Sequence, residues 1–346
     1  MSTRISTDEA LSLFADTDLI GLGMAADAAR RRHHPHNIAS YIIDRNINYT
    51  NVCTEYCSFC AFYRAKGHDE AYVHPQEVIF SKIQETLDVG GTGVLMQGGL
   101  HPDLPVEWYE DLFGAIKQRF KIHLHVLSAP EILNIAQISG LSLHDTIARL
   151  RDAGMDSIPG AGAEILHDEV RHRIARLKCN TEEWLSVHRT AHQLGVRTTA
   201  TMMWGCGETL AHRVHHLNVL RQLQDETGGF TAFIPWSFQR DNTSLGRFVK
   251  EEATSVEFLR TLAVCRLFLD NITNIQTSWV TQGLKVCQLG LRFGGNDVGS
   301  IMLEENVVSQ AGANFHASEE DLRRIIRDAG FVPKQRDTLY RTYFLN

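Results

Sequence analysis

The sequence predicts a single parallel α/β barrel of the (β/α)8 TIM type, for three reasons. Short strand-like runs alternate with segments of helical period, and strands separated by helices pair in parallel. Eight such units follow one another without a linker or a change in composition. The chain has 346 residues, whereas a barrel of this kind needs roughly 250. The alternative, an open doubly wound sheet, would show a nucleotide-binding glycine turn that residues 90–99 do not form.

The elements are expected in the following order. Ser6 and Glu9 have the spacing of a capping box, which begins one or two helices that end at residues 33–35. The predicted strands are residues 39–48, 93–97, 122–127, 157–159, 197–203, 230–236, 275–280 and 297–302. Between them, apolar residues recur at intervals of three, four and seven, as on helices that pack against a sheet. We expect an N-terminal helical segment (1–36), the barrel (37–316) and a C-terminal extension packed on it (317–346).

Composition and charge narrow the kinds of partner. The chain has 34 basic and 41 acidic residues, a formal net charge of -7, and no Lys/Arg run suited to a phosphate backbone, so we expect no nucleic-acid partner. The N-terminus is polar and acidic, unlike a signal peptide, and no apolar run approaches the roughly 18 residues of a transmembrane helix. We therefore expect a soluble, cytoplasmic protein with no membrane partner.

Three of the seven cysteines, Cys53, Cys57 and Cys60, lie on the loop after the first predicted strand. In a parallel barrel, catalytic residues lie where strands end. Soft thiolates at short spacing select zinc or an iron–sulfur cluster. Structural zinc sites and electron-transfer clusters both need four protein ligands. The next candidates for a fourth ligand, His68 and Cys179, lie outside the sequence spacings that are usual in such sites. Three thiolates on a cubane cluster leave one iron open for a reacting ligand.

This loop, CTEYCSFC, resembles the CxxxCxxC motif of the radical S-adenosylmethionine (radical SAM) enzymes. The resemblance implies a [4Fe-4S] cluster on the three cysteines, with S-adenosylmethionine on the fourth iron as the source of a 5′-deoxyadenosyl radical. It also implies that Phe59 packs near the adenine and that Gly98 and Gly99 represent the Gly-Gly-Glu motif. Leu100 stands where that motif commonly has Glu, so backbone carbonyls must then bind the methionine amino group.

Residues 51–62, 160–171 and 294–313 resemble one subgroup of these enzymes, which includes aminofutalosine synthase, the deazaflavin synthase subunits and dehypoxanthine futalosine cyclase. The variants at residues 234–239 and 297–308 resemble those of the cyclases. The resemblance implies an oxidoreductase of the futalosine route to menaquinone that closes a C–C bond in dehypoxanthine futalosine. Such an enzyme needs an external one-electron reductant. The alternatives are one of the synthases or, outside enzymes, an iron–sulfur electron carrier.

The resemblance also implies ligands for S-adenosylmethionine. Glu164 falls where relatives contact its ribose, although a first-turn Glu also favours a helix N-terminus. Arg171 falls where relatives place a cation for the methionine carboxylate, with Arg173 and Arg176 as alternatives. Ser128 ends the third strand and is either a ligand or a helix cap.

The remaining candidates are expected to face the substrate. Asp297 is interpreted as a ribose ligand or a general base, or else as part of an Asx turn. Asn296, Trp236 and Gln239 are candidates for substrate binding, although a sixth-strand aromatic is also typical of core. His123 and His125 alternate with apolar residues and are expected to point into the barrel, where polar groups need partners.

Overall fold

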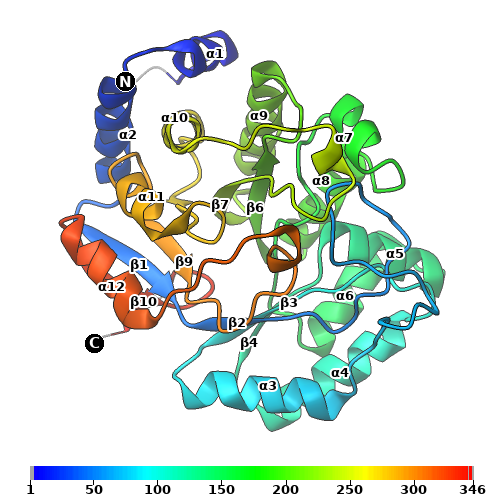
Figure 1. The fold of residues 1–346 in the computed structure, drawn as a ribbon. Helices are drawn as coiled ribbons and strands as arrows, with labels where there is room; N and C mark the ends of the chain where they lie inside the picture. Colours follow the sequence, from blue (N-terminus) through cyan, green and yellow to red (C-terminus); the bar gives the residue numbers. More distant parts are fainter. Residues whose placement is uncertain (1–3, 342, 345–346) are drawn as a thin grey trace.

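Parallel strands form the centre of the structure, and helices surround them (Figure 1). The structure is a computed structural model and describes residues 4–341 and 343–344. Seven parallel strands form one sheet, in which each strand pairs with the next along the chain. In order across this sheet they are β2 (Asp44–Ile47), β3 (Gly93–Met96), β4 (His123–Val126), β5 (Ser157–Ile158), β6 (Arg197–Trp204), β7 (Phe230–Ser237) and β8 (Asn274–Ile275).

A second sheet closes the barrel. It has the order β11-β10-β1-β9 and consists of β11 (Tyr343–Phe344), β10 (Val332–Arg336), β1 (Ile38–Ile42) and β9 (Asp297–Ser300). The strands β1 and β2 are consecutive, so the chain passes directly from this sheet into the larger one. On the other side, a parallel bridge between Gln276 and Asp297 joins the end of β8 to β9. The strands therefore form a closed circuit, as the sequence predicts.

Twelve α-helices are present among the described residues, with short 3-10 turns at Leu245–Arg247 and Ser309–Ala311. They are α1 (Thr7–Ala15), α2 (Leu19–His33), α3 (Gln76–Asp88), α4 (Val106–Arg119), α5 (Ala129–Ser139), α6 (Leu143–Ala153), α7 (Asp168–Ile174), α8 (Thr181–Gln193), α9 (Leu210–Thr227), α10 (Ser255–Phe268), α11 (Gly283–Gly290) and α12 (Glu319–Asp328). The predicted capping box begins α1, because the Glu9 N–H donates to Ser6 Oγ and the Ser6 N–H to Glu9 Oε2. None of the helices in these ranges is long and apolar enough to cross a membrane.

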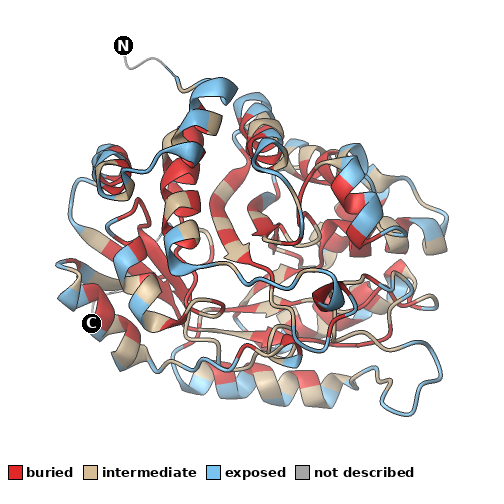
Figure 2. Ribbon diagram, turned by 45° about the horizontal axis from the view of Figure 1, so that its top comes forward, coloured by how far each residue is buried: buried red, intermediate tan, exposed pale blue. Residues whose placement is uncertain are grey.

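The apolar core lies between the strands and the inward faces of the helices. Figure 2 shows the same arrangement as buried residues on the strands and inward helix faces and exposed residues on the outside. Strand β4 illustrates how period two sets this arrangement. Leu124 and Val126 are fully buried, whereas His123 and His125 are half-buried on the other face. Both histidine rings hydrogen-bond to Ser157 Oγ at 2.7 Å, so the partner that they need is supplied by the neighbouring strand.

The segment after the barrel joins it at two places. Helix α12 packs on α11 and β10, around a smaller apolar cluster that includes Tyr41 and Trp279. Strand β10 pairs in parallel with β1, with Val332 opposite Ile38. The sequence suggested a tail that covers the barrel; the structure makes part of that tail a strand beside β1, because residues 332–336 find free edge groups there.

Candidate active site

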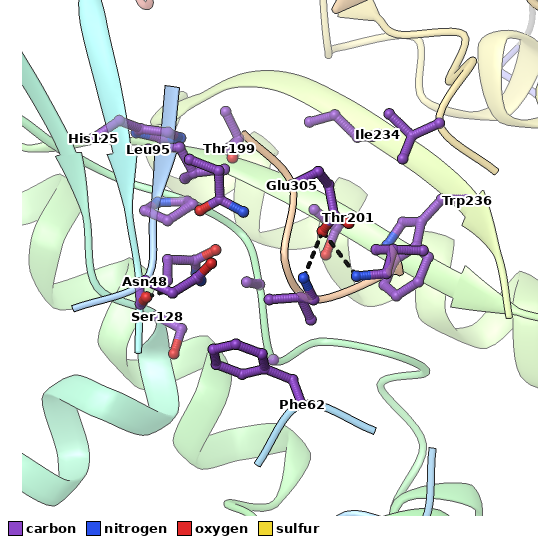
Figure 3. Close-up of a pocket in the computed structure, with 18 of the residues that line it drawn as sticks. Asn48, Phe62, Leu95, His125, Ser128, Thr199, Thr201, Ile234, Trp236 and Glu305 are labelled. Atoms are coloured by element: carbon purple, nitrogen blue, oxygen red, sulfur yellow. Dashed lines mark hydrogen bonds between the residues drawn. The ribbon is translucent and has the colours of Figure 1, made fainter. Parts of the chain in front are cut away.

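A cavity of about 430 Å³ lies inside the barrel. At the carboxyl ends of the strands it is lined by the three clustered cysteines, Gly98 and Gly99. At the opposite end it is lined by Asp44 and Arg336. Between these ends Figure 3 shows a wall of mixed character, with Leu95, Ile234 and Trp236 as apolar members and Asn48, Thr199 and Thr201 as polar members. The cavity therefore joins a thiol-rich mouth to a deep pocket with charged groups.

Hydrogen bonds to four other segments hold the cysteine loop in place. The Cys53 N–H donates to Arg64 O (3.0 Å), and the Thr54 N–H donates to Leu100 O (3.2 Å). Ser58 donates to Ile174 O and accepts from the Leu245 N–H. All three thiols are free and line the cavity. The structure thus brings together the three predicted metal ligands.

Burial makes two of the three thiols, Cys53 and Cys57, hard to ionise. Burial raises the pKa of the Cys57 thiol to about 12, and the positive charge of Lys178 opposes this shift. Burial likewise raises the pKa of Cys53. A metal ion removes this cost, since a coordinated thiol loses its proton outright. Three soft ligands with no fourth protein thiol in the cavity lining suit an iron–sulfur cubane with one open iron.

Gly98 and Gly99 allow the second strand's loop to approach the cysteine loop. A Cβ atom on Gly99 would lie 2.2 Å from Val52 O and 2.7 Å from Cys53 Cβ, so only glycine fits. The Gly98 N–H donates to Glu131 Oε1 (2.9 Å), and the Tyr49 hydroxyl donates to the same oxygen (2.7 Å). Although Leu100 replaces the common Glu of this motif, a carboxylate still reaches the loop from α5.

Ser128 has both of the roles that the sequence left open. It caps α5 through a capping box with Glu131, and its hydroxyl donates to Glu131 Oε2 (2.6 Å). It also lines the cavity. Glu131 itself was missed by the sequence reasoning, although the capping-box spacing with Ser128 pointed to it.

Glu164 is held in a conformation and a charge state that suit a ligand. Its φ is 40°, in the left-handed region that a non-glycine residue rarely adopts. Its carboxylate is buried and pairs with Lys178 Nζ (3.1 Å) and Arg171 Nη1 (3.8 Å). The second oxygen, Oε2, is buried without a hydrogen bond. A buried acceptor without a donor costs free energy until a ligand supplies one, and a ribose hydroxyl fits that need.

Arg171 does not line the cavity, contrary to the predicted contact with a methionine carboxylate. Its guanidinium donates to the carbonyl oxygens of Gly162, Ala163 and Cys179 and so holds the loop that carries Glu164. The planar guanidinium therefore donates its hydrogen bonds to backbone carbonyl oxygens and not to a ligand carboxylate. Neither Arg173 nor Arg176 lines the cavity.

Lys178 is the cation at this end of the cavity, and the sequence reasoning missed it. Its ammonium lies 5.2 Å from the centre of the Phe59 ring, so the predicted adenine neighbour and the cation stand together. Burial lowers the pKa of Lys178, but the nearness of Cys57 and Glu164 raises it above its ordinary value. Lys178 is therefore charged.

Three further predicted residues lie outside the cavity, while Trp236 lines it. Asp297 is fully buried in a bidentate ion pair with Arg336 (2.5 and 3.0 Å), and its oxygens also accept from Ser40 and Gly299. With these partners it has no oxygen facing a substrate, which corrects its predicted role as base or ribose ligand.

The side chains of Asn296 and Gln239 also hydrogen-bond to other groups of the protein. Asn296 Oδ1 accepts from Arg266 (2.7 Å) and from the Ile275 N–H (2.8 Å), and its amide donates to Asn274. These bonds tie β8 to β9. Gln239 lines a separate hollow and donates to Ser237. Neither side chain reaches the substrate cavity, which corrects both predictions.

The fold and the thiol loop define the class of protein, and comparison with known proteins agrees. Residues 47–220 match the model of the radical SAM superfamily, and the chain belongs to this superfamily. Residues 227–345 match a family described as the CofH/MqnC C-terminal region. The cofactors are a [4Fe-4S] cluster and S-adenosylmethionine, which the orphaned Glu164 oxygen, the three thiols and the Gly99 approach all fit.

Curated relatives narrow the family further. The chain is 49% identical over 342 residues to the cyclic dehypoxanthine futalosine synthase of Streptomyces coelicolor, covering 97% of this chain and 85% of that protein. It is 47% identical over 338 residues to the enzyme of the same name from Halalkalibacterium halodurans, covering 97% and 91%. The aminodeoxyfutalosine synthase of Thermus thermophilus is 39% identical over 343 residues, covering 98% and 92%.

Solved structures support the fold. Methylornithine synthase (PylB) matches with a TM-score of 0.73 and 18% identity, over 96% of this chain and 95% of that one. The hydrogenase maturase HydG from Carboxydothermus hydrogenoformans matches with a TM-score of 0.78 and 18% identity, over 98% and 78%.

Proposed function

We propose that the protein converts dehypoxanthine futalosine to cyclic dehypoxanthine futalosine in menaquinone biosynthesis, as a radical SAM cyclase that forms a C–C bond. The observation that carries this proposal is the likeness to two cyclic dehypoxanthine futalosine synthases, at 47% and 49% identity over 97% of the chain. The aminodeoxyfutalosine synthase is less similar, at 39%. The alternatives, a synthase reaction or a simple electron carrier, have no comparable support.

Cys53, Cys57 and Cys60 would hold the cluster, and S-adenosylmethionine would lie beside Phe59, Ser128 and Glu164. When bound, these groups would supply the chemistry that removes a hydrogen atom from C4′ of the substrate ribose. Glu164 Oε2 would accept a hydrogen bond from the ribose of S-adenosylmethionine. Lys178 would lie near the negative carboxylate of the methionine part and replace Arg171 as its cation.

The deeper cavity would hold the substrate. Leu95, Ile234 and Trp236 form an apolar wall for the benzoate ring (Figure 3). The hydroxyls of Thr199 and Thr201 on the neighbouring strand lie within reach of sugar hydroxyls in the same cavity. Positioned this way, the ribose carbon radical and the ring would be close enough for intramolecular attack.

The reaction also requires an external one-electron reductant as a partner.

A single assay tests the proposed function: reconstituted protein, dithionite and S-adenosylmethionine are incubated with dehypoxanthine futalosine, and products are identified by mass. We expect 5′-deoxyadenosine and a product two hydrogens lighter than the substrate. Absence of both contradicts the proposal. Consumption of an enolpyruvyl benzoate with transfer of the adenosyl group would instead assign the synthase reaction, and neither reaction would leave an electron carrier.

A further inference from the structure

We propose that Asp44 is the base of the reaction, and that its carboxylate accepts the proton that the substrate ring loses when it regains aromaticity. This proposal rests on the proposed function, because only ring closure on an arene creates that proton. Asp297, which the sequence favoured for the role, has both oxygens occupied by Arg336, Ser40 and a backbone N–H.

Five carboxylates line the cavity, and three of them are engaged by other groups of the protein. Glu131 accepts from Tyr49, Gly98 and Ser128 and joins three segments of the wall. Glu164 is paired with Lys178. Glu305 accepts the N–H groups of residues 307, 308 and 309 at 2.7 to 2.9 Å and so shapes its own loop. Glu55 also has a buried oxygen, Oε2, without a hydrogen-bond partner among the described residues, but it lies on the cysteine loop, at the other end of the cavity from the deep pocket.

Asp44 differs from these four in place and in partners. It begins β2, at the end of the cavity away from the cysteines, and it is half-buried because its carboxylate borders the cavity. No backbone N–H donates to it and no ion pair engages it among the described residues. The nearest cation, Arg336, is occupied by Asp297. One carboxylate in the deep part of the cavity is thus held by no ion pair and no backbone N–H, and its hydrogen-bond partner is the side chain of Ser300.

The surroundings of Asp44 suit a base at neutral pH. The pKa of Asp44 is raised to about 6: burial raises it most and the charge of Asp297 on β9 adds to the rise, while a hydrogen bond from Ser300 and the charge of Arg336 on β10 lower it in part. The other titratable groups in this part of the cavity are His125 on β4 and Tyr340. Burial lowers the pKa of His125 to about 3, so it stays neutral. Asp44 is ionised at pH 7 and holds a proton more firmly than an exposed aspartate.

After the ribose carbon has added to the ring, the C–H bond at the newly substituted ring carbon breaks. Its proton goes to an oxygen of Asp44, and its electron pair stays in the ring. One electron then leaves the ring for a one-electron acceptor of the iron–sulfur class, and the ring becomes aromatic. Together with the hydrogen taken from C4′, the substrate loses two hydrogens, as the product requires.

The test compares Asp44→Asn with the wild type and measures two products, 5′-deoxyadenosine and the cyclic product. Because Asp44 acts after hydrogen abstraction, we expect the variant to keep making 5′-deoxyadenosine, while the ratio of cyclic product to 5′-deoxyadenosine falls at least about tenfold. A ring-centred organic radical should then accumulate and be visible by electron paramagnetic resonance in frozen samples. The matched control is Asp152→Asn on the outer face of α6, which should leave both the ratio and the spectrum unchanged.

The pH dependence of the same ratio gives a second test that needs no variant. In the wild type the ratio should fall as the pH drops through about 6, where Asp44 takes up a proton in advance. Asp44→Glu should restore part of the ratio that the Asn variant loses. Circular dichroism and iron content check that each variant folds and carries its cluster.

Three results would overturn the proposal. The first is an Asp44→Asn variant with an unchanged ratio, and the second is a wild-type ratio that does not depend on pH between 5 and 7. The third is loss of 5′-deoxyadenosine in the variant with S-adenosylmethionine binding intact, which would place Asp44 before ring closure. A wild type that makes no cyclic product contradicts the proposed function itself, and this distinguishes the two failures.

Discussion

Lys178 and Glu164 form a buried ion pair at the mouth of the cavity, with Nζ and Oε1 3.1 Å apart. The sequence did not predict that these two residues pair, because Glu164 lies before α7 and Lys178 lies after it. Each needs the other, since a charge buried without its partner costs several kcal/mol. The free oxygen of Glu164 is left for a ligand.

Replacement of Glu164 by Gln should weaken the binding of S-adenosylmethionine. The amide is a weaker acceptor than a carboxylate and leaves Lys178 buried without its partner, so we expect a loss of at least about tenfold in affinity, or about 1.4 kcal/mol. Isothermal titration of the reconstituted protein measures this. Glu182→Gln, at an exposed position on α8, serves as the control, and equal affinities of the two variants would refute the assignment.

Gly99→Ala should disrupt the cluster site. The added Cβ would lie 2.2 Å from Val52 O and 2.7 Å from Cys53 Cβ, so the cysteine loop must move and one thiol leaves its position. We expect a large loss of bound iron and of the cluster's visible absorption. The matched control is Gly114→Ala in α4, where a Cβ meets nothing within 4 Å, and which should raise helix stability by up to about 1 kcal/mol. An intact cluster in Gly99→Ala would contradict this description of the loop.

The three clustered cysteines should be separable from the other four by their effect on iron. Cys57→Ala is expected to abolish the brown colour, because two thiolates cannot hold the cubane. Cys265, fully buried on α10, is a packing residue, and Cys265→Ala should keep its cluster and lose only some stability. Iron and sulfide analysis after reconstitution checks both, and full iron content in Cys57→Ala would exclude the assigned ligand.

The ion pair between Arg336 and Asp297 should be a major source of barrel stability. Arg336→Met leaves Asp297 fully buried without its cation, which we expect to cost roughly 3 to 5 kcal/mol of the free energy of unfolding. Urea denaturation followed by circular dichroism measures the change. Arg189→Met, which breaks ion pairs at the surface, should change stability far less, and a similar loss in both variants would count against the role of this pair.

The sequence predicted the barrel well because its signal is local. Each predicted strand overlaps one in the structure, since period two, β-branched residues and flanking turns all act over a few residues. Two strands differ most from their predicted ranges. The predicted strand 275–280 shares only Ile275 with β8, and the first strand, predicted as 39–48, is divided at Ile43 into β1 and β2. The two halves belong to different sheets. A local sequence pattern does not show with which strand each half pairs.

The site was predicted where chemistry is concentrated in a motif and missed where it depends on distant partners. The cysteine loop has its spacing within eight residues. The predicted role of Asp297 was wrong because its carboxylate pairs with Arg336, 39 residues away in the sequence. Arg336 lies on β10, and no local sequence pattern shows that this strand pairs with β1. Asp44 was missed because nothing in the local sequence of β2, Asp-Arg-Asn-Ile, shows that this side chain lines the cavity of the closed barrel.

The most direct test of the proposed reaction follows the hydrogen on C4′ of the substrate ribose. Dehypoxanthine futalosine with deuterium at C4′ of the ribose is incubated with the reconstituted protein, S-adenosylmethionine and dithionite, and both products are analysed by mass spectrometry. The account predicts deuterium in 5′-deoxyadenosine and a cyclic product that has lost it. Formation of 5′-deoxyadenosine without deuterium, or its absence in the presence of this substrate, would contradict the central claim that this barrel is a radical SAM cyclase.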